Sequence, residues 1–301
     1  MKIMVTGGSG FIASPIVSRL LEKGHHVKIL DLKEPNIKHK NIEFVRKSIL
    51  DQIETDIKGY GMVFHFAALL GVENSDNHPL ETMRINLEGS VNVFKSALAA
   101  GIKNMIYSSS SEVYGEPREL PIKEDSTKGP VSTYGVSKLA AEIYAKAYNQ
   151  EFGTDIRIVR FFNVYGPGQQ ENWVVPIFLK TAMKNEPIKV FGNGNQTRCF
   201  TYVDDIAKGV LKVMEKGKRG EAYNIGNNQP TTILELAKII RELTNSKSEI
   251  IVAGFGKETR LKEREIEYRQ PDISKMKALG WEPKTMIREG IKKILEKKNF
   301  L

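Results

Sequence analysis

The sequence predicts an α/β fold in which a doubly wound parallel sheet is followed by a smaller C-terminal domain. Segments with the patterns of β-strands and amphipathic helices alternate from residue 2 to residue 166, which is typical of a parallel sheet with helical crossovers. A glycine-rich turn separates the first strand from the first helix, as it does in many sheets of this kind. The alternation becomes less regular after residue 166, which suggests that a second domain begins there.

The first elements have the plainest patterns. Residues 2–6 form a short β-rich run, and residues 11–24 carry apolar side chains at helical spacing as far as Gly24. Residues 25–32 then predict a second strand, which completes a strand, loop, helix and strand unit. Further strands are predicted over 44–49, 62–68, 104–111 and 156–166, and further long helices over 80–101 and 132–153.

The character of the sequence changes after Gly166. Proline and glycine become frequent, as in Pro167, Gly168 and the GNGN stretch at 192–195, and the expected elements become shorter. We therefore expect two domains, residues 1–166 and 167–301, with some elements of the second returning to the main body.

The composition is that of an ordinary globular protein. Of its 301 residues, 41% are hydrophobic and 27% are charged. No run of eighteen apolar residues occurs, so we expect no membrane span. The first residues lack the cleavage site of a secretory signal, and the single cysteine, Cys199, allows no internal disulfide. These features favour a cytoplasmic setting.

The chain is basic, with a formal net charge of +9. Lysine and arginine are interspersed with acidic residues except over 33–47 and 292–298, and such runs are usually solvated faces. We therefore expect no nucleic-acid partner. A basic surface also suits a small substrate that carries phosphate groups.

The glycine-rich turn fits the G-x-G-x-x-G/A pattern from Gly8 to Ala13. Such a turn brings the backbone close to a pyrophosphate, and the N-terminus of the following helix presents free N–H groups to the anion. The position between a predicted strand and a predicted helix supports a dinucleotide site in a Rossmann-type sheet. The residues expected to line this site are Gly7, Gly10, Phe11 and Ile12.

An acidic residue follows at the distance that the dinucleotide motif requires. Asp31 lies 21 positions after Gly10, at the end of the second predicted strand, where a carboxylate can bond the ribose hydroxyls and repel a 2′-phosphate. This favours NAD over NADP, although Lys33 lies close enough to weaken the preference. Asp51 follows the third strand and could reach the adenine edge, or could equally serve as a turn or cap residue.

A candidate catalytic pair lies on the helix predicted over 132–153. Tyr134 and Lys138 are four positions apart, so both side chains lie on one face of the helix. A nearby ammonium favours the phenolate form of a tyrosine, which can then accept a proton from a sugar hydroxyl. Lys138 could also bond the nicotinamide ribose. The serines at 108–111 end the preceding strand, where doubly wound sheets place their sites.

Several longer segments extend this pattern along the chain. They are TGGSGFIAS (6–14), HFAA (65–68), RINLEGS (84–90), RFFNVYGP (160–167), GNGNQTRCFTYVDD (192–205) and RQPDISKMKALGW (269–281). Together with Tyr134 and Lys138, these segments resemble the extended short-chain dehydrogenase/reductase family of NAD-dependent nucleotide-sugar epimerases, dehydratases and decarboxylases. Ala13 stands where a third glycine is usual in that family.

The resemblance implies roles for further residues. Ser110 would be the catalytic hydroxyl that bonds the reacting sugar oxygen, and Ala67 and Asn86 would lie in the cofactor site. It implies no metal. The substrate, a nucleotide-sugar, would be bound by Asn163, which contacts it, and by Arg198 and Arg269, which hold its phosphates.

The resemblance also implies a shared first step, in which the tyrosine takes the C4 hydroxyl proton and NAD takes the C4 hydride. A 4-epimerase then returns the hydride to the other face of the 4-keto sugar. Glu112 is the position that best distinguishes this reaction from dehydration and decarboxylation, because dehydratases and decarboxylases of the family carry a glutamate there. Segment 160–169 is similar to epimerases, whereas NQTRCF and R-x-P-D-I are similar to UDP-glucuronate decarboxylases.

We predict a 4-epimerase and include Glu112 with Tyr134, Lys138 and Ser110 among the candidate catalytic residues, although a structural role for Glu112 is equally compatible with epimerisation. The alternatives are a UDP-glucuronate decarboxylase or a nucleotide-sugar 4,6-dehydratase, in which Glu112 would be catalytic. An NAD(P)H reductase or a non-enzymatic dinucleotide sensor is less favoured. The helices at 82–101 and 134–152 match a pair that relatives pack across a dimer interface, so the resemblance also implies a homodimer; their apolar residues could equally face the chain's own sheet.

Overall fold

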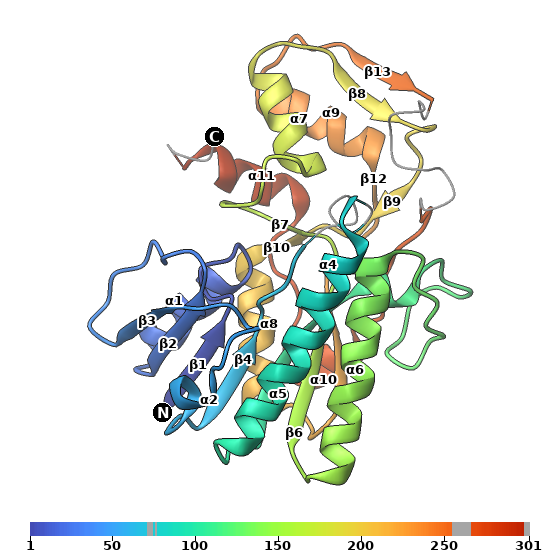
Figure 1. Cartoon of the computed structure of the whole chain (residues 1–301). Helices are drawn as coiled ribbons and strands as arrows, with labels where there is room; N and C mark the ends of the chain where they lie inside the picture. The colour runs from blue at the N-terminus through green and yellow to red at the C-terminus, as the bar shows by residue number, and fades with distance from the viewer. Residues whose placement is uncertain (71–74, 76, 255–265, 298–301) are drawn as a thin grey trace.

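The computed structural model describes residues 1–70, 75, 77–254 and 266–297. Its main body is a seven-stranded parallel sheet (Figure 1), as predicted. The strand order is β11-β6-β5-β4-β1-β2-β3, the doubly wound order of a Rossmann-type sheet with one strand added. The strands are β1 (Lys2–Thr6), β2 (His26–Asp31), β3 (Ile42–Arg46), β4 (Met62–His65), β5 (Asn104–Ser110), β6 (Asp155–Phe161) and β11 (Ala222–Ile225).

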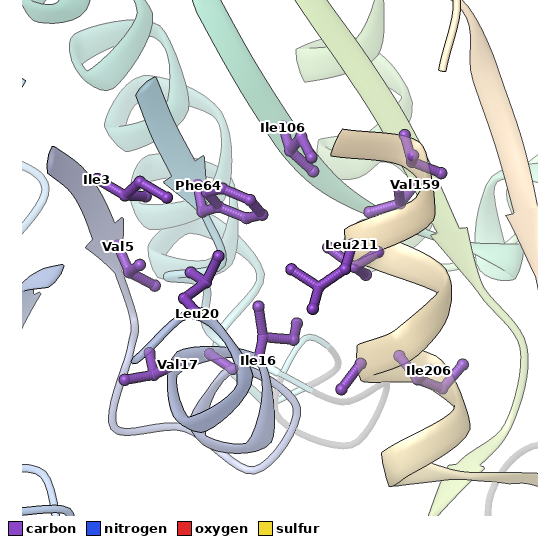
Figure 2. Close-up of a cluster of buried hydrophobic side chains, with 14 of the residues drawn as sticks. Ile3, Val5, Ile16, Val17, Leu20, Phe64, Ile106, Val159, Ile206 and Leu211 are labelled. Atoms are coloured by element: carbon purple, nitrogen blue, oxygen red, sulfur yellow. The ribbon is translucent and has the colours of Figure 1, made fainter. Parts of the chain in front are cut away.

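Helices cover both faces of this sheet. On one face, α1 (Ala13–Glu22) and α8 (Val203–Lys216) bury their apolar sides against the strands. Figure 2 shows Ile16 and Leu20 of α1 facing Phe64 of the sheet, with Leu211 of α8 beside them. On the other face lie α2 (Glu54–Ile57), α5 (Gly89–Ala99) and α6 (Thr133–Glu151).

The long helix predicted over 80–101 is interrupted. It consists of α4 (Pro79–Met83), one turn of π-helix named η1 (Arg84–Glu88), and α5. A π-turn inserts one extra residue into a helix and is frequent at functional sites. Here it contains Asn86, whose side chain is fully buried.

The strand predicted over 156–166 is also divided. Strand β6 ends at Phe161, and the chain resumes as β7 (Val164–Tyr165), which leaves the main sheet and pairs with β10 (Thr201–Tyr202). The break lies at Asn163, which has a φ of 34°, a left-handed conformation that asparagine tolerates better than most residues. Apolar periodicity alone does not reveal such a break.

The later part of the chain builds a separate apolar core. It contains α7 (Val174–Met183), β8 (Ile188–Phe191), α9 (Ile233–Leu243), β13 (Ile250–Ala253) and α11 (Ile287–Leu295), which lie at the top of Figure 1. The short strands β9 (Thr197–Arg198) and β12 (Thr231–Thr232) pair with each other.

Elements beyond residue 166 also belong to the main body. Strand β11 extends the sheet next to β6, and α8 packs against α1. Arg19 of α1 donates to Asp204 of α8 from Nε at 2.9 Å. The segment after α10 (Ser274–Ala278) is joined to α8 as well, because the backbone N–H of Thr285 donates to Asp205 at 2.7 Å. None of the described helices is long and apolar enough to cross a bilayer.

Candidate functional site

The predicted site residues gather mainly at the carboxyl ends of the central strands. The glycine loop follows β1, Asp31 ends β2, Ala67 follows β4, and Ser110 ends β5. In an open parallel sheet the strand ends on either side of the point where the order reverses form the ligand crevice. That point lies between β1 and β4, so the sheet itself brings these side chains together.

The glycine loop has the shape that a dinucleotide requires. Gly7 has a φ of 70°, and a Cβ at this position would lie 2.5 Å from the backbone nitrogen of Ala67. The N–H of Gly10 donates to the carbonyl of Gly7 at 3.0 Å, which closes the turn. Helix α1 begins after Ile12, whose apolar side chain cannot cap the first turn. The uncapped N–H groups at the N-terminus of α1 can therefore bind a phosphate.

The predicted adenosine-end residues have different surroundings. Both oxygens of Asp31 accept backbone N–H groups, from Ser9 and from Lys33, each at 3.0 Å. Each oxygen keeps a second lone pair, so the carboxylate can still bond ribose hydroxyls. Asp51 is exposed and accepts the N–H of Ser48 at 2.8 Å, which is the geometry of a turn residue.

Tyr134 and Lys138 both lie on the buried side of α6. The helix begins at Thr133 because the hydroxyl of Ser132 caps it, accepting the N–H of Gly135 at 3.1 Å. Lys138 is 2% exposed, and its Nζ donates to the carbonyl of Ser108 at 2.8 Å and lies 5.9 Å from the centre of the Tyr134 ring. Burial lowers the pKa of Lys138 to about 7, against the raising effect of the Glu142 carboxylate.

Ser110 completes the predicted catalytic trio. Burial raises the pKa of Tyr134, the Glu112 carboxylate raises it further, and a hydrogen bond with Ser110 lowers it. The hydroxyl of Ser110 also accepts the N–H of Glu112 at 3.2 Å and so caps the short 3₁₀ helix η2 (Ser111–Tyr114). Its position is therefore fixed from two sides.

Glu112 forms a buried ion pair with Arg269. The guanidinium Nη1 donates to Glu112 Oε1 at 2.7 Å and approaches the hydroxyl of Ser111 at 3.4 Å. The side chains of Arg269 and Glu112 are 6% and 11% exposed. The resemblance places Arg269 at a substrate phosphate, whereas in the structure this residue joins the closing segment of the chain to η2.

The other predicted ligand residues lie around the break between β6 and β7. The amide oxygen of Asn163 is buried and has no hydrogen-bond partner among the described residues. An unbonded buried acceptor on a left-handed residue is typical of a site that awaits a ligand. Arg198 is 8% exposed, and its Nη1 donates to the carbonyl of Thr197 at 2.8 Å. Gly168, which follows β7, lies close to Phe11 of the glycine loop.

Of the two remaining predicted cofactor residues, Ala67 is half-buried and Asn86 is fully buried. Ala67 lies against Gly7 through its backbone. The side chain of Asn86 accepts the N–H of Leu69 at 2.7 Å and donates to the carbonyl of Leu69 at 3.0 Å and to Ser137 at 3.2 Å. Asn86 thus binds protein groups around the site.

Sequence reasoning missed a buried network behind the catalytic strand. Glu142 accepts Arg160 Nε at 2.8 Å, Arg160 Nη2 at 2.6 Å and the hydroxyl of Ser109 at 2.6 Å. Arg160 also donates to the hydroxyl of Tyr114 at 2.6 Å, which in turn donates to Asn224 of β11. The available signal was the spacing, because Glu142 lies eight positions after Tyr134 on the same face of α6.

Among the residues that the structure describes, no cluster of histidine, cysteine or acidic side chains could hold a metal ion. The donor groups of the site are hydroxyls, a lysine amine and backbone N–H groups. They suit proton transfer and the binding of a phosphate-bearing ligand.

Several known proteins resemble this chain in sequence and in fold. A model of the NAD dependent epimerase/dehydratase family matches residues 3–226. A Methanocaldococcus jannaschii protein named "Putative UDP-glucose 4-epimerase" is 37% identical, with 97% of each chain covered. A UDP-N-acetyl-alpha-D-glucosaminuronate decarboxylase of Bacillus cytotoxicus is 34% identical, covering 98% of this chain and 97% of that protein. The solved structure of Thermotoga maritima UDP-glucose 4-epimerase with UDP-glucose superposes with a TM-score of 0.90 at 33% identity, with 97% of each chain covered.

Proposed function

Because the chain belongs to the NAD-dependent epimerase/dehydratase family, we propose that it is a nucleotide-sugar 4-epimerase that acts through Tyr134, Lys138 and Ser110. The observation that carries the proposal is the pairing of Glu112 with Arg269. This pairing gives the only carboxylate of η2 a structural partner. The hydroxyls of Tyr134 and Ser110 remain as one acid–base set, which is what chemistry at a single carbon needs.

The proposed role of Tyr134 is to move the proton of the sugar's C4 hydroxyl. Because burial raises the pKa of Tyr134, the phenol keeps its proton until a positive charge stabilises the phenolate. The protonated form of Lys138, whose own pKa is lowered by burial to about 7, supplies that charge. Ser110 holds the C4 oxygen by a hydrogen bond while the proton moves. Gly7, Gly10 and Asp31 would hold NAD, which would supply the acceptor for the C4 hydride and the source of its return to the other face of the 4-keto sugar.

The proposed cofactor site uses the sheet edge described above. Gly7 and Gly10 leave room for the pyrophosphate, and the turn after Ile12 presents N–H groups to it. Asp31 bonds the adenosine ribose, which supports NAD in preference to NADP. Asp51 accepts the N–H of Ser48 within a turn, and its one proposed contact with the cofactor is at the edge of the adenine ring.

The proposed substrate site faces the cofactor from the later part of the chain. Asn163 offers its unbonded amide oxygen to the nucleotide-sugar, and Arg198 holds a phosphate. The residues of the two regions approach each other where Gly168 lies near Phe11.

A decarboxylase is the second candidate, and a specific observation favours it. The guanidinium of Arg269 lies beside Ser111 and Glu112, which follow Ser110, and its Nε has no hydrogen-bond partner among the described residues. A guanidinium is suited to bind the carboxylate of a uronic acid. In that reaction Glu112 and Arg269 would touch the substrate, which agrees with the similarity to the Bacillus cytotoxicus decarboxylase.

Substrate profiling by NMR distinguishes the two reactions. Purified protein with NAD is incubated in parallel with UDP-glucose, UDP-glucuronate and GDP-mannose. The epimerase proposal expects a galacto-configured product from UDP-glucose without net reduction of NAD. Release of CO₂ from UDP-glucuronate, or a 4-keto-6-deoxy sugar from GDP-mannose, would instead make Glu112 part of the mechanism.

The proposal includes a cytoplasmic homodimer formed through α4, α5 and α6. The support comes from two side chains of α6, Ile143 and Tyr144, which are 60% and 46% exposed although they are large and apolar. Val93 of α5, in contrast, is fully buried against the chain's own sheet. Sedimentation velocity of the wild type and of Ile143→Glu tests the dimer, which the charge should dissociate.

A further inference from the structure

A buried histidine lies between the strand that precedes the glycine loop and the helix that follows the π-turn η1. His65, the last residue of β4, is 1% exposed and has a hydroxyl at each ring nitrogen. Its Nδ1 lies 2.7 Å from the hydroxyl oxygen of Thr6, which ends β1 immediately before Gly7. Its Nε2 lies 2.9 Å from the hydroxyl oxygen of Ser90, which follows the π-turn η1.

The protons of this arrangement can be assigned. The hydroxyl of Ser90 donates its only proton to the carbonyl of Asn86 at 2.5 Å, so it must accept a proton from Nε2 of His65. Burial lowers the pKa of His65 to about 3, so the ring is neutral and carries that single N–H. Nδ1 is then an acceptor, and the hydroxyl of Thr6 donates to it.

The chain of hydrogen bonds continues in both directions. Toward the cofactor side, the hydroxyl of Thr6 accepts the N–H of Ala67 at 3.4 Å, the same residue that lies against Gly7. Toward the catalytic side, the amide of Asn86 donates to Ser137 at 3.2 Å, and the hydroxyl of Ser137 donates to the carbonyl of Tyr134 at 2.8 Å. These hydrogen bonds, together with the covalent link from the backbone of Asn86 to its side chain, therefore connect Thr6, which precedes the glycine loop, with α6.

Every side chain along this path is almost fully buried. Thr6, His65, Asn86, Ser90 and Ser137 are each 0–1% exposed. Polar groups buried in this way are costly unless each one is bonded, and a fully bonded network fixes a single arrangement of the elements that it joins. The path joins β1, β4, η1 and α6, which together carry most of the proposed cofactor and catalytic residues.

We propose that His65 is a positioning residue, which in its neutral Nε2–H form couples the position of the glycine loop to that of Tyr134. Binding of NAD at the loop then favours the placement of the catalytic helix that the reaction needs. The inference joins the NAD site to the catalytic helix and holds whichever sugar is the substrate.

A double-mutant cycle tests the coupling. Thr6→Val removes the hydroxyl on one side of His65 with little change of volume, and Ser90→Ala removes the hydroxyl on the other side. Each single substitution is expected to raise the Kd for NAD, measured by calorimetry without substrate, and to lower kcat at saturating NAD, each about tenfold. Because either substitution interrupts the same path, the double variant should be about as impaired as the worse single variant.

Matched controls separate positioning from ordinary destabilisation. Thr154→Val removes an equally buried threonine hydroxyl at the opposite end of the sheet, where it bonds Asn149. Ser96→Ala changes a buried serine on α5, the helix that also carries Ser90. Both controls are expected to keep kcat and the NAD Kd within about twofold of wild type, whatever their effect on Tm. Thr6→Ser, which keeps the hydroxyl, should restore both quantities.

Two outcomes would overturn the inference. The first is a Ser90→Ala variant whose kcat and NAD Kd match those of Ser96→Ala. The second is a pair of effects that multiply in the Thr6→Val, Ser90→Ala double variant, because independent effects would mean that no common path exists. In both outcomes the Kd for NAD is measured without any sugar, so that quantity does not depend on the proposed substrate.

Discussion

Glu142 lies one helical turn after Lys138 on α6, and its carboxylate is held from behind by the guanidinium of Arg160. Both members of this ion pair are 1% exposed. Glu142 also accepts the hydroxyl of Ser109 on β5, the strand that carries Ser110. The pair thus fixes α6 to β5 and places a negative charge near the buried Lys138.

Breaking this pair from one side should destabilise the protein strongly. Glu142→Gln leaves Arg160 as an uncompensated buried charge, which typically costs about 3–5 kcal/mol of unfolding free energy. Urea denaturation followed by circular dichroism measures the loss. The double variant Glu142→Gln, Arg160→Met removes both charges and should recover most of the stability. A single Gln variant as stable as wild type would show that the pair does not hold α6 to the sheet.

Tyr134→Phe should abolish turnover and leave the fold intact. Removing an acid–base group typically costs about 10²–10⁴-fold in rate, and the proposed mechanism has no other group to move the C4 proton. Tyr144→Phe on the exposed side of the same helix is the control and should keep full activity. Turnover of the Tyr134 variant near the wild-type level would rule out the proposed base.

His65 should make the protein sensitive to acid within a defined range. The pKa of His65 in the folded protein is about 3, below the ordinary value of 6.5. Between these two values the His65 ring is protonated in the unfolded chain and neutral in the folded protein. This contribution to stability is complete above pH 6.5 and is lost as the pH falls toward 3, by up to about 1.4 kcal/mol per pH unit.

The measurement is the unfolding free energy from urea melts between pH 7 and pH 4. Replacing His65 with Gln should flatten the slope relative to wild type, and the same replacement at the exposed His26 serves as the control. Equal slopes in wild type and the His65 variant would contradict a neutral, buried ring.

Arg269 should matter to stability and to the choice of reaction. Arg269→Met removes the partner of a buried carboxylate, so we expect a Tm decrease of several degrees. If the reaction is epimerisation, the double variant Glu112→Gln, Arg269→Met should recover stability and retain 4-epimerase activity within about tenfold. Complete loss of turnover in a stable double variant would place the pair in the chemistry.

Much of the fold could be predicted from sequence because its signals are local. Alternating strands and helices, the glycine turn and Asp31 at the end of a strand each have a fixed spacing, and the sheet order confirms the fold that they imply. The break at Asn163 and the π-turn around Asn86 could not be predicted, because each depends on what the neighbouring elements offer to a few backbone groups. Apolar periodicity carries no information of that kind.

The site was only partly predictable for a similar reason. The proximity of Tyr134, Lys138 and Ser110 follows from helix spacing and from the strand end. The partner of Arg269 lies 157 positions away at Glu112, and the network of Glu142 and Arg160 depends on a buried interface between a helix and two strands. Such pairings become visible only when the sheet has brought distant segments together.

Isotope labelling tests the central claim most directly. The protein is incubated with NAD and UDP-glucose that carries deuterium at C4, and the product is examined by NMR. Removal and return of the same hydride at one carbon predicts UDP-galactose with the deuterium retained at C4. Deuterium found at another carbon, or no reaction with UDP-glucose while UDP-glucuronate releases CO₂, would contradict the proposed epimerase mechanism.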